Sequence, residues 1–306
     1  MFKNLLMSVL LGSVVVGNVL AADMPDIPPI NPDEGRIGEV RRVEDPTEFK
    51  VCADPDNMPY SNSKQEGFED KIAAVLAEEL GKKLSFQYAY YRQGFLRNTL
   101  NANRCDYVMS TTSDNDSMRT SIPYYRSGFV FVYRKSSGYN ITDWDAPDLR
   151  KGIIGIVGQS PPTRPLADHD LMGNARPYRL QRDLNFPPSQ LIDDLVKGDI
   201  DIAIVWGPIA GYFAKSASIP LVVMPIPEYE DKNVKGKENW NISIGVRNKD
   251  KARAEELNKA ITKRQADIDR ILDEYGVPHS AVVQGDSLEK KAREQFRGEK
   301  VDKPMK

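Results

Sequence analysis

Short apolar runs alternate with helix-spaced apolar positions along most of the chain. The first run begins at Phe49 and ends in a polar loop at residues 54–61, because Pro55 and Pro59 cannot donate ladder hydrogen bonds. Beyond Gly67 the apolar residues recur at helical spacing, and Gly81 ends the helix. Ligands of open α/β sheets bind at the carboxyl ends of strands, so this loop is the first candidate site.

The same alternation continues through about 240 residues, enough for one large domain or two lobes. Eight strands are predicted from their Val, Ile, Tyr and Phe content: Phe49–Ala53, Leu84–Tyr88, Asp106–Ser110, Gly128–Tyr133, Ile153–Val157, Asp201–Val205, Leu221–Met224 and Ile242–Val246. Helices are predicted at Glu69–Leu80, Phe95–Asn101, Asp148–Lys151, Ser189–Lys197, Ile209–Lys215 and Asp250–Tyr275. Strands alternating with helices predict an α/β fold with mostly parallel sheets covered by helices.

The two ends of the chain differ from the middle. Residues 1–21 are expected to be a signal peptide, with Lys3 before a mostly apolar stretch that is short for a membrane span. With no Cys at the cleavage site, we expect an exported periplasmic protein without a membrane anchor. Residues 22–45 are predicted to form an extended arm and residues 281–306 a charged tail. Both ends could be inert, or could contact a partner protein.

Charge and metal-ligating residues exclude some functions. Removing residues 1–21 moves the formal charge from -2 to -3, which gives no case for nucleic-acid binding. The chain has two His residues, His169 and His279, and two Cys residues, which do not form a spaced metal-ligand set. We therefore expect no metal site.

The cysteines are Cys52 and Cys105, and an exported protein permits a disulfide between them. If they lie on straight neighbouring parallel strands, their Cα atoms would be roughly 10 Å apart, beyond the limit of about 7 Å. The sequence leaves open whether they are bonded.

Several motifs occur in an order that resembles the type II periplasmic solute-binding proteins. They are Met58-Pro-Tyr60, Gly67-Phe-Glu69, Asp106-Tyr-Val-Met-Ser-Thr-Thr112 and Pro123-Tyr-Tyr125. The resemblance implies two lobes, each a mostly parallel sheet flanked by helices, joined by two crossover strands that act as a hinge. Lobe 1 would comprise residues 46–130 plus 246–280, and lobe 2 residues 131–245. The crossings would be Pro123–Val132 and Trp240–Arg247.

A narrower set of motifs resembles the binding-protein-like J component found with periplasmic quinoprotein methanol dehydrogenases. The motifs are Cys52–Ser61, Arg92–Leu100, Cys105-Asp106, Pro123–Ser127 and Ala203–Tyr212. The resemblance implies a non-catalytic accessory protein, expected to be a monomer, that docks on a pyrroloquinoline-quinone (PQQ) methanol dehydrogenase or assists its assembly. No cofactor is expected in this chain, because PQQ and calcium or lanthanide would belong to the partner.

The position of Arg119 departs from the pattern of the amino-acid receptors and argues against an ordinary receptor of that kind. Receptors of that kind typically place an Arg shortly after a Thr-x-Thr loop, where its guanidinium forks onto the ligand carboxylate. Here Arg119 follows Thr112 by seven residues and should flank the crossing, and Asp114 and Asp116 come first. Their charges would repel an anionic ligand.

The cleft residues follow from the predicted strand ends. They could bind a small molecule or a partner, or simply pack or cap their own turns. From lobe 1 they are Asp54, Asn57, Met58, Tyr60, Arg92, Phe95, Thr111 and Thr112; from lobe 2 they are Gln159, Ser160 and Trp206.

Two other functions remain open. A transport receptor would close on a small polar molecule by hinge bending and deliver it to an ABC permease. A lyase on the same scaffold, similar to cyclohexadienyl dehydratase, would need an acid or base positioned in the cleft. Asp54 is the one candidate carboxylate for this role. Asp106 and Asp201 begin strands and should lie away from the cleft.

Overall fold

The computed structural model describes residues 42–113, 115–179, 184–227 and 239–283. The predicted signal peptide, nearly all of the N-terminal arm, all but residues 281–283 of the C-terminal tail, and Asp114 lie outside these residues. The strands are β1 (Glu48–Ala53), β2 (Asp56–Asn57), β3 (Ser61–Asn62), β4 (Lys83–Tyr88), β5 (Tyr107–Thr112), β6 (Arg119–Thr120), β7 (Tyr125–Arg134), β8 (Ile154–Val157), β9 (Ala175–Tyr178), β10 (Ile202–Trp206), β11 (Leu221–Pro225) and β12 (Asn239–Val246). The α-helices are α1 (Phe68–Glu79), α2 (Phe95–Asn98), α3 (Thr163–Asp168), α4 (Gln190–Lys197), α5 (Gly207–Lys215) and α6 (Lys251–Glu274).

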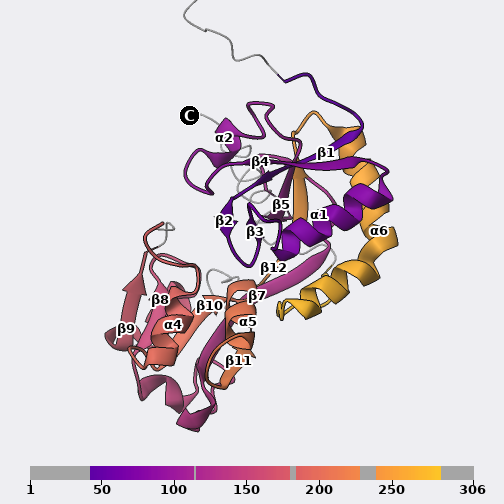
Figure 1. Ribbon diagram of the computed structural model, residues 1–306. Helices are drawn as coiled ribbons and strands as arrows, with labels where there is room; N and C mark the ends of the chain where they lie inside the picture. The colour runs from indigo at the N-terminus through magenta and orange to yellow at the C-terminus, as the bar shows by residue number, and fades with distance from the viewer. Residues whose placement is uncertain (1–41, 114, 180–183, 228–238, 284–306) are drawn as a thin grey trace, which may run out of the picture. The chain divides into compact units, whose positions relative to one another are not determined.

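Lobe 1 is built on strands in the order β4-β1-β5-β12-β7 (Figure 1). Strand β1 is parallel to both β4 and β5, and Val51 lies opposite Phe86 on one side and Tyr107 on the other. Side chains alternate across the sheet, so Val51 joins the core beneath α1 and α6, whereas Cys52 packs with Phe95 on the opposite face. The two long helices pack side by side on one face.

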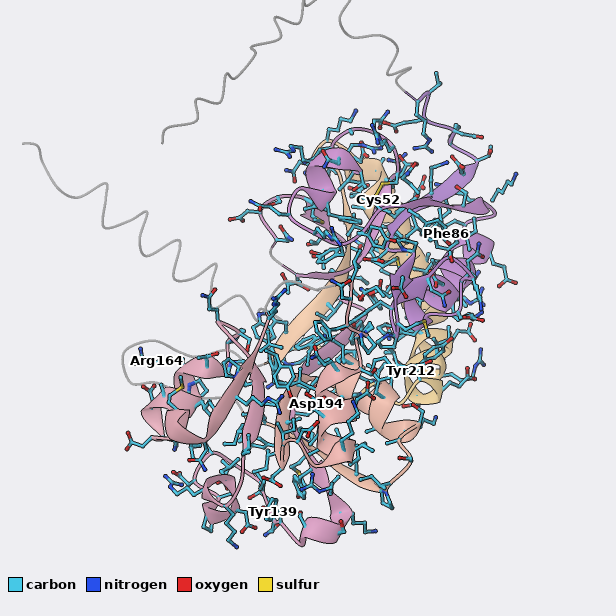
Figure 2. All side chains as sticks on the ribbon, turned by 60° about the vertical axis from the view of Figure 1, so that its left-hand side comes forward. Cys52, Phe86, Tyr139, Arg164, Asp194 and Tyr212 are labelled. Atoms are coloured by element: carbon cyan, nitrogen blue, oxygen red, sulfur yellow. A yellow bond between two sulfur atoms is a disulfide. The ribbon has the colours of Figure 1, made fainter. Side chains whose placement is uncertain are left out.

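Lobe 2 has β8, β9 and β10 in parallel, with β7 antiparallel to β10 and β11 (Figure 1). Alternate residues of β7 again serve two cores. Phe131 lies in a core with Trp144, and Val132 lies in another core with residues of α4 and α5. Figure 2 labels Tyr139, Arg164 and Asp194 on this lobe and Cys52 and Phe86 on lobe 1.

Strands β7 and β12 carry the chain between the two sheets. The first part of β7 pairs with β12, with Tyr125 opposite Ile242 and Gly128 opposite Asn239. The rest of β7, from Phe129, pairs with β10. Strand β7 therefore belongs to both sheets. The loops at the ends of the strands of the two lobes meet around one cleft.

A second contact joins the lobes where α5 meets the end of α6. A Cβ on Gly211 would lie 1.9 Å from the carbonyl oxygen of Gly276, so only glycine permits this approach. Beside it, the Lys215 Nζ donates to the carbonyl oxygen of Glu274 at 2.8 Å. The rings of Tyr212 and Tyr275 stack with their centroids 5.9 Å apart.

The α/β prediction is confirmed, and a strand is found at each of the eight predicted places. The sequence missed β9 and α3, together with the short strands β2, β3 and β6. The predicted helix at Asp148–Lys151 is a 3-10 turn at Pro147–Arg150, and α2 ends at Asn98 rather than Asn101.

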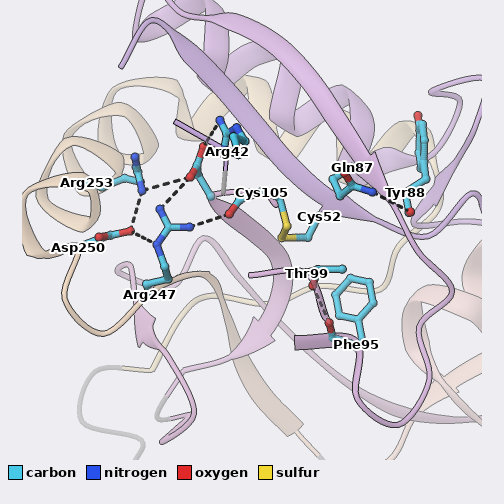
Figure 3. Close-up of a disulfide and its surroundings, with 11 residues drawn as sticks. Arg42, Cys52, Gln87, Tyr88, Phe95, Thr99, Cys105, Arg247, Asp250 and Arg253 are labelled. Carbon is cyan, nitrogen blue, oxygen red and sulfur yellow. Dashed lines mark hydrogen bonds and ion pairs between the residues drawn. A yellow bond between two sulfur atoms is a disulfide. The ribbon is translucent and has the colours of Figure 1, made fainter. Parts of the chain in front are cut away.

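Cys52 and Cys105 form a disulfide with their Cα atoms 5.3 Å apart (Figure 3). The sequence had left the bond open, and the separation of roughly 10 Å that a parallel register allowed does not occur. Strand β5 starts only at Tyr107, so Cys105 lies in the preceding turn and is not held to the strand spacing.

An ion-pair cluster surrounds the same turn (Figure 3). Asp106 accepts hydrogen bonds from Arg42 and Arg247, each at 2.8 Å, and Arg253 lies 3.6 Å away. Arg247 also donates to the carbonyl oxygen of Cys105 at 2.7 Å. Burial would raise the pKa of Asp106, but the arginine hydrogen bonds outweigh it, and the pKa is lowered. The cluster links Arg42 to the start of β5 and the start of α6. As expected, Asp106 lies away from the cleft.

Candidate functional site: a two-part interlobe cleft

Two cavities lie where the loops of the two lobes meet. The lobe-1 cavity has a volume of about 320 Å³ and the lobe-2 cavity about 620 Å³, the size range of small-molecule sites. Both are lined by Asn57, Trp206 and Ile209. We therefore treat them as two parts of one cleft.

Glu69 is the most unusual side chain in the lobe-1 cavity. A Cβ on Gly67 would lie 1.9 Å from the carbonyl oxygen of Tyr60, so glycine lets the start of α1 approach the cleft loop closely. This places Glu69, the second residue of α1, in the cavity wall. The residue is 9% exposed, and its Oε1 has no hydrogen-bond partner among the described residues.

The surroundings of Glu69 favour its protonated form. Burial, aided by the charge of Asp70, raises the pKa of Glu69 to about 8, although a hydrogen bond from Ser110 opposes the rise. Burial also raises the pKa of Tyr60 and Tyr125, so both hydroxyls stay neutral. Without a ligand, the lobe-1 cavity thus holds a neutral carboxylic acid among tyrosine hydroxyls near neutral pH.

Asp54 has a different role from Glu69. Its Oδ1 accepts the backbone N–H of Asp56 at 2.8 Å, and its Oδ2 accepts that of Tyr91 at 2.7 Å. These bonds join the loop after β1 to the loop after β4. Asp54 therefore shapes the cavity wall, which weakens the case for it as a free acid or base.

Trp206 stands between the two cavities at the end of β10. Its ring meets those of Phe129 and Trp240 edge-on, with centroids 5.4 Å and 5.6 Å away. Partly buried and lining both cavities, it is at once a packing residue and a cleft residue. The sequence had left these two roles as alternatives.

The lobe-2 cavity is mostly apolar. The loop after β8 contributes Gln159, whose φ is 62°, and Ser160, whose hydroxyl donates to the carbonyl oxygen of Val157 at 2.6 Å. Strand β9 adds Tyr178, whose hydroxyl donates to Asp194 at 2.6 Å. Proline and aliphatic side chains form much of the remaining wall, at Pro161, Pro177, Pro187, Pro188 and Leu191, and Arg176 and Arg179 also line it.

Eight of the eleven predicted cleft residues line a cavity. They are Asp54, Asn57, Tyr60, Phe95, Thr112, Gln159, Ser160 and Trp206.

The other three, Met58, Arg92 and Thr111, line neither cavity. Arg92 is exposed, with its guanidinium 5.4 Å from the ring centre of Tyr90. The hydroxyl of Thr111 accepts a hydrogen bond from Asn115, and the strand alternation turns it away from Thr112. Met58 is half-buried outside the cavity that its neighbour Asn57 lines.

The sequence missed Glu69, Ser110, Tyr91 and Tyr125 as cavity-lining residues. For Glu69 a signal existed, since it ends the Gly-Phe-Glu motif directly after the cleft loop. Ser110 has a φ of 48° within β5, a backbone strain that no sequence pattern reveals.

The carboxylate anchor that an amino-acid receptor places after its Thr loop is missing from the described lining of the lobe-1 cavity. Arg119 is exposed and donates to the carbonyl oxygen of Asn248 at 3.1 Å, as expected from its place beside the crossing. Among the described residues that line the lobe-1 cavity, none is Lys, Arg or His. The described part of the chain also shows no group of three or more His, Cys, Asp or Glu that could hold a metal ion. In the same residues, no helix has the length and apolar character to cross a membrane.

Comparison with known proteins places the chain in a family. The sequence profile of the bacterial extracellular solute-binding proteins, family 3, matches residues 49–278. Protein MoxJ of Methylorubrum extorquens AM1 is 28% identical over 244 residues, which cover 75% of this chain and 81% of MoxJ.

Two solved structures are similar in fold and sequence. MxaJ from Methlophaga aminisulfidivorans MPT is 31% identical with a TM-score of 0.69, and the match covers 76% of this chain and 100% of MxaJ. The periplasmic binding protein XoxJ from Methylobacterium extorquens AM1 is 36% identical with a TM-score of 0.65, and the match covers 76% and 100%. The chain therefore belongs to the bacterial extracellular solute-binding proteins of family 3, has the type II periplasmic binding protein fold, and resembles MoxJ.

Proposed function

We propose that this chain is a non-catalytic periplasmic accessory protein of methanol oxidation. It would dock on a PQQ-dependent methanol dehydrogenase, or assist the assembly or activation of that enzyme. The observation that carries the proposal is its similarity to MxaJ and XoxJ, since the matched region spans the whole of both structures at more than 30% identity. PQQ and the calcium or lanthanide ion would be held by the dehydrogenase.

The lobe-1 cavity supports this proposal, because its described lining has no Lys, Arg or His. A receptor for amino acids fixes the ligand carboxylate with a forked guanidinium. Here Arg119 is bonded elsewhere, and the lobe-1 cavity contains the carboxyl groups of Asp54 and Glu69 instead. Delivery of ordinary amino acids to a permease therefore fits this chain poorly.

The non-catalytic part of the proposal rests on the roles of the acidic groups. Asp54 is engaged by two backbone amides, which suits a loop-shaping residue better than a proton-transfer group. Glu69 has a shifted pKa, and shifted groups also occur at active sites. An assay of the purified protein against cyclohexadienyl substrates would test a lyase activity, and turnover abolished by Glu69→Gln would contradict this part.

Affinity capture tests the partner. The mature protein would be immobilised and exposed to a periplasmic extract of the organism that encodes it, grown on methanol with calcium or with a lanthanide. An immobilised amino-acid receptor of the same fold serves as the control. We expect a quinoprotein methanol dehydrogenase on this protein and not on the control. Equal recovery on both would contradict the proposal.

A second candidate is a solute receptor of an ABC transporter, which the two cavities and the two connecting strands favour. Thermal-shift screening with small polar molecules distinguishes it. A ligand that stabilises the protein, with no dehydrogenase captured, would favour this candidate.

A further inference from the structure

The lobe-1 cavity combines an unpaired acceptor with an acidic lining. Glu69 Oε1 is buried and has no partner in the described part of the chain. An unmade hydrogen bond of this kind is costly, so a ligand that supplies an N–H donor gains by making it. Asp54 cannot take this role so readily, because both of its oxygens already accept backbone N–H groups.

The cavity walls are suited to positive charge. Five of the lining side chains are aromatic: Tyr60, Tyr91, Phe95, Tyr125 and Trp206. Ring faces attract cations, and the attraction is stronger where water is excluded. With no Lys, Arg or His among the described lining residues, nothing there competes with an incoming cation.

Backbone strain marks the same place. Ser110 has a φ of 48° although it is not glycine and lies within β5. Its hydroxyl lies 3.3 Å from the hydroxyls of both Tyr124 and Tyr125. Strained residues of this kind concentrate at ligand-binding positions. The Ser110 hydroxyl also hydrogen-bonds to the Glu69 carboxyl, so this strained residue lies beside the unpaired acceptor.

We propose that the lobe-1 cavity binds a small alkylammonium ion that has at least one N–H and no carboxylate. The N–H donates to Glu69 Oε1, and the alkyl part lies against the rings around Trp206. A carboxylate on the ligand is disfavoured because the described lining of the lobe-1 cavity holds no cation to meet it. The proposal concerns the cleft alone and does not rest on the dehydrogenase partnership.

Titration calorimetry on the purified mature protein tests the charge requirement. The probes are propylammonium, the neutral 1-propanol of similar size, and tetramethylammonium, which has no N–H. We expect propylammonium to bind at least about tenfold more tightly than either of the others. Equal affinity for propylammonium and 1-propanol, or no binding of propylammonium up to millimolar concentration, would overturn the proposal.

Two variants test the residue. Glu69→Gln should weaken propylammonium binding at least about tenfold, because an amide cannot offer a charged acceptor. Asp56→Asn is the matched control: it also removes a carboxylate from this region, but Asp56 is exposed and lines neither cavity. Unchanged binding to a folded Glu69→Gln variant would contradict the assignment.

The pH dependence supplies an independent readout. A cation favours ionised Glu69, so binding below pH 8 should release a proton and tighten about tenfold per pH unit as pH rises. The groups that face or influence Glu69 are Asp54, Asp70, Tyr60, Tyr91, Tyr124 and Tyr125. The tyrosines remain protonated in this range because their pKa values are raised. An affinity independent of pH in the wild type would refute the role of Glu69.

Discussion

The buried carboxyl of Glu69 should make the ligand-free protein less stable as pH rises. Its pKa is raised from 4.5 to about 8, so between these values the folded protein binds a proton that the unfolded chain has released. Folding then takes up a proton, and the free energy of unfolding falls with increasing pH. The contribution is fully present below pH 4.5 and is lost as pH rises through about 8.

The magnitude follows from the shift. A change of one in pKa corresponds to about 1.4 kcal/mol, and the pKa of Glu69 rises from 4.5 to about 8. Across the full window, the ionisation of Glu69 should therefore lower the free energy of unfolding by roughly 5 kcal/mol. Asp70, whose pKa is raised to about 6, contributes in the same direction at lower pH. A comparison of two proteins that share Asp70 isolates the contribution of Glu69.

The assay is urea unfolding of wild type and Glu69→Gln at intervals between about pH 5 and pH 8, without ligand. The amide of the variant does not titrate, so it adds only an offset that is independent of pH, and the pH-dependent difference reports the carboxyl. We expect Glu69→Gln to gain roughly 3 kcal/mol relative to wild type over this range. Glu66→Gln, which changes an exposed carboxyl of the preceding loop, should follow the wild-type curve. Parallel curves for wild type and Glu69→Gln would refute the account of this site.

Three further predictions concern the framework. Reduction of the Cys52–Cys105 bond, which closes a loop with a sequence separation of 53, should lower the free energy of unfolding by about 4 kcal/mol in urea titrations; an unchanged midpoint would contradict this. Asp106→Asn should cost roughly 3 kcal/mol or more by the same assay, because it leaves Arg42 and Arg247 without their buried carboxylate; a loss below about 1 kcal/mol would show that the cluster contributes little. Gly211→Ala should cost roughly 2 kcal/mol or more in thermal unfolding, since its Cβ would clash with the carbonyl of Gly276. Gly173→Ala is the control and should change stability little, because nothing lies within 4 Å of the added Cβ.

The fold was readable from the sequence because its strands and helices follow strong periodic patterns. The run from Phe49 and the helix from Gly67 agree with β1 and α1 to within a residue or two. Strand β9 was missed because Ala-Arg-Pro-Tyr has little β-forming character and lies at the edge of the sheet, where Pro is tolerated.

The sequence predicted site residues correctly only where a loop directly follows a strand. Asp54, Asn57 and Trp206 were found by that rule. Glu69 was missed because it begins a helix, and the close approach that turns it into the cavity depends on Gly67 meeting the backbone of Tyr60. The disulfide was left open because the turn before β5 depends on tertiary contacts around Asp106.

The proposed partnership is tested most directly by equilibrium binding of two purified proteins. The mature chain would be immobilised and titrated with PQQ-loaded methanol dehydrogenase of the calcium type and of the lanthanide type from the same organism. An amino-acid receptor of the same fold is immobilised in parallel as the control. We expect saturable binding of one dehydrogenase type to this protein and not to the control. Failure of both dehydrogenases to bind at micromolar concentration, to a protein shown to be folded with its disulfide formed, would contradict the accessory function.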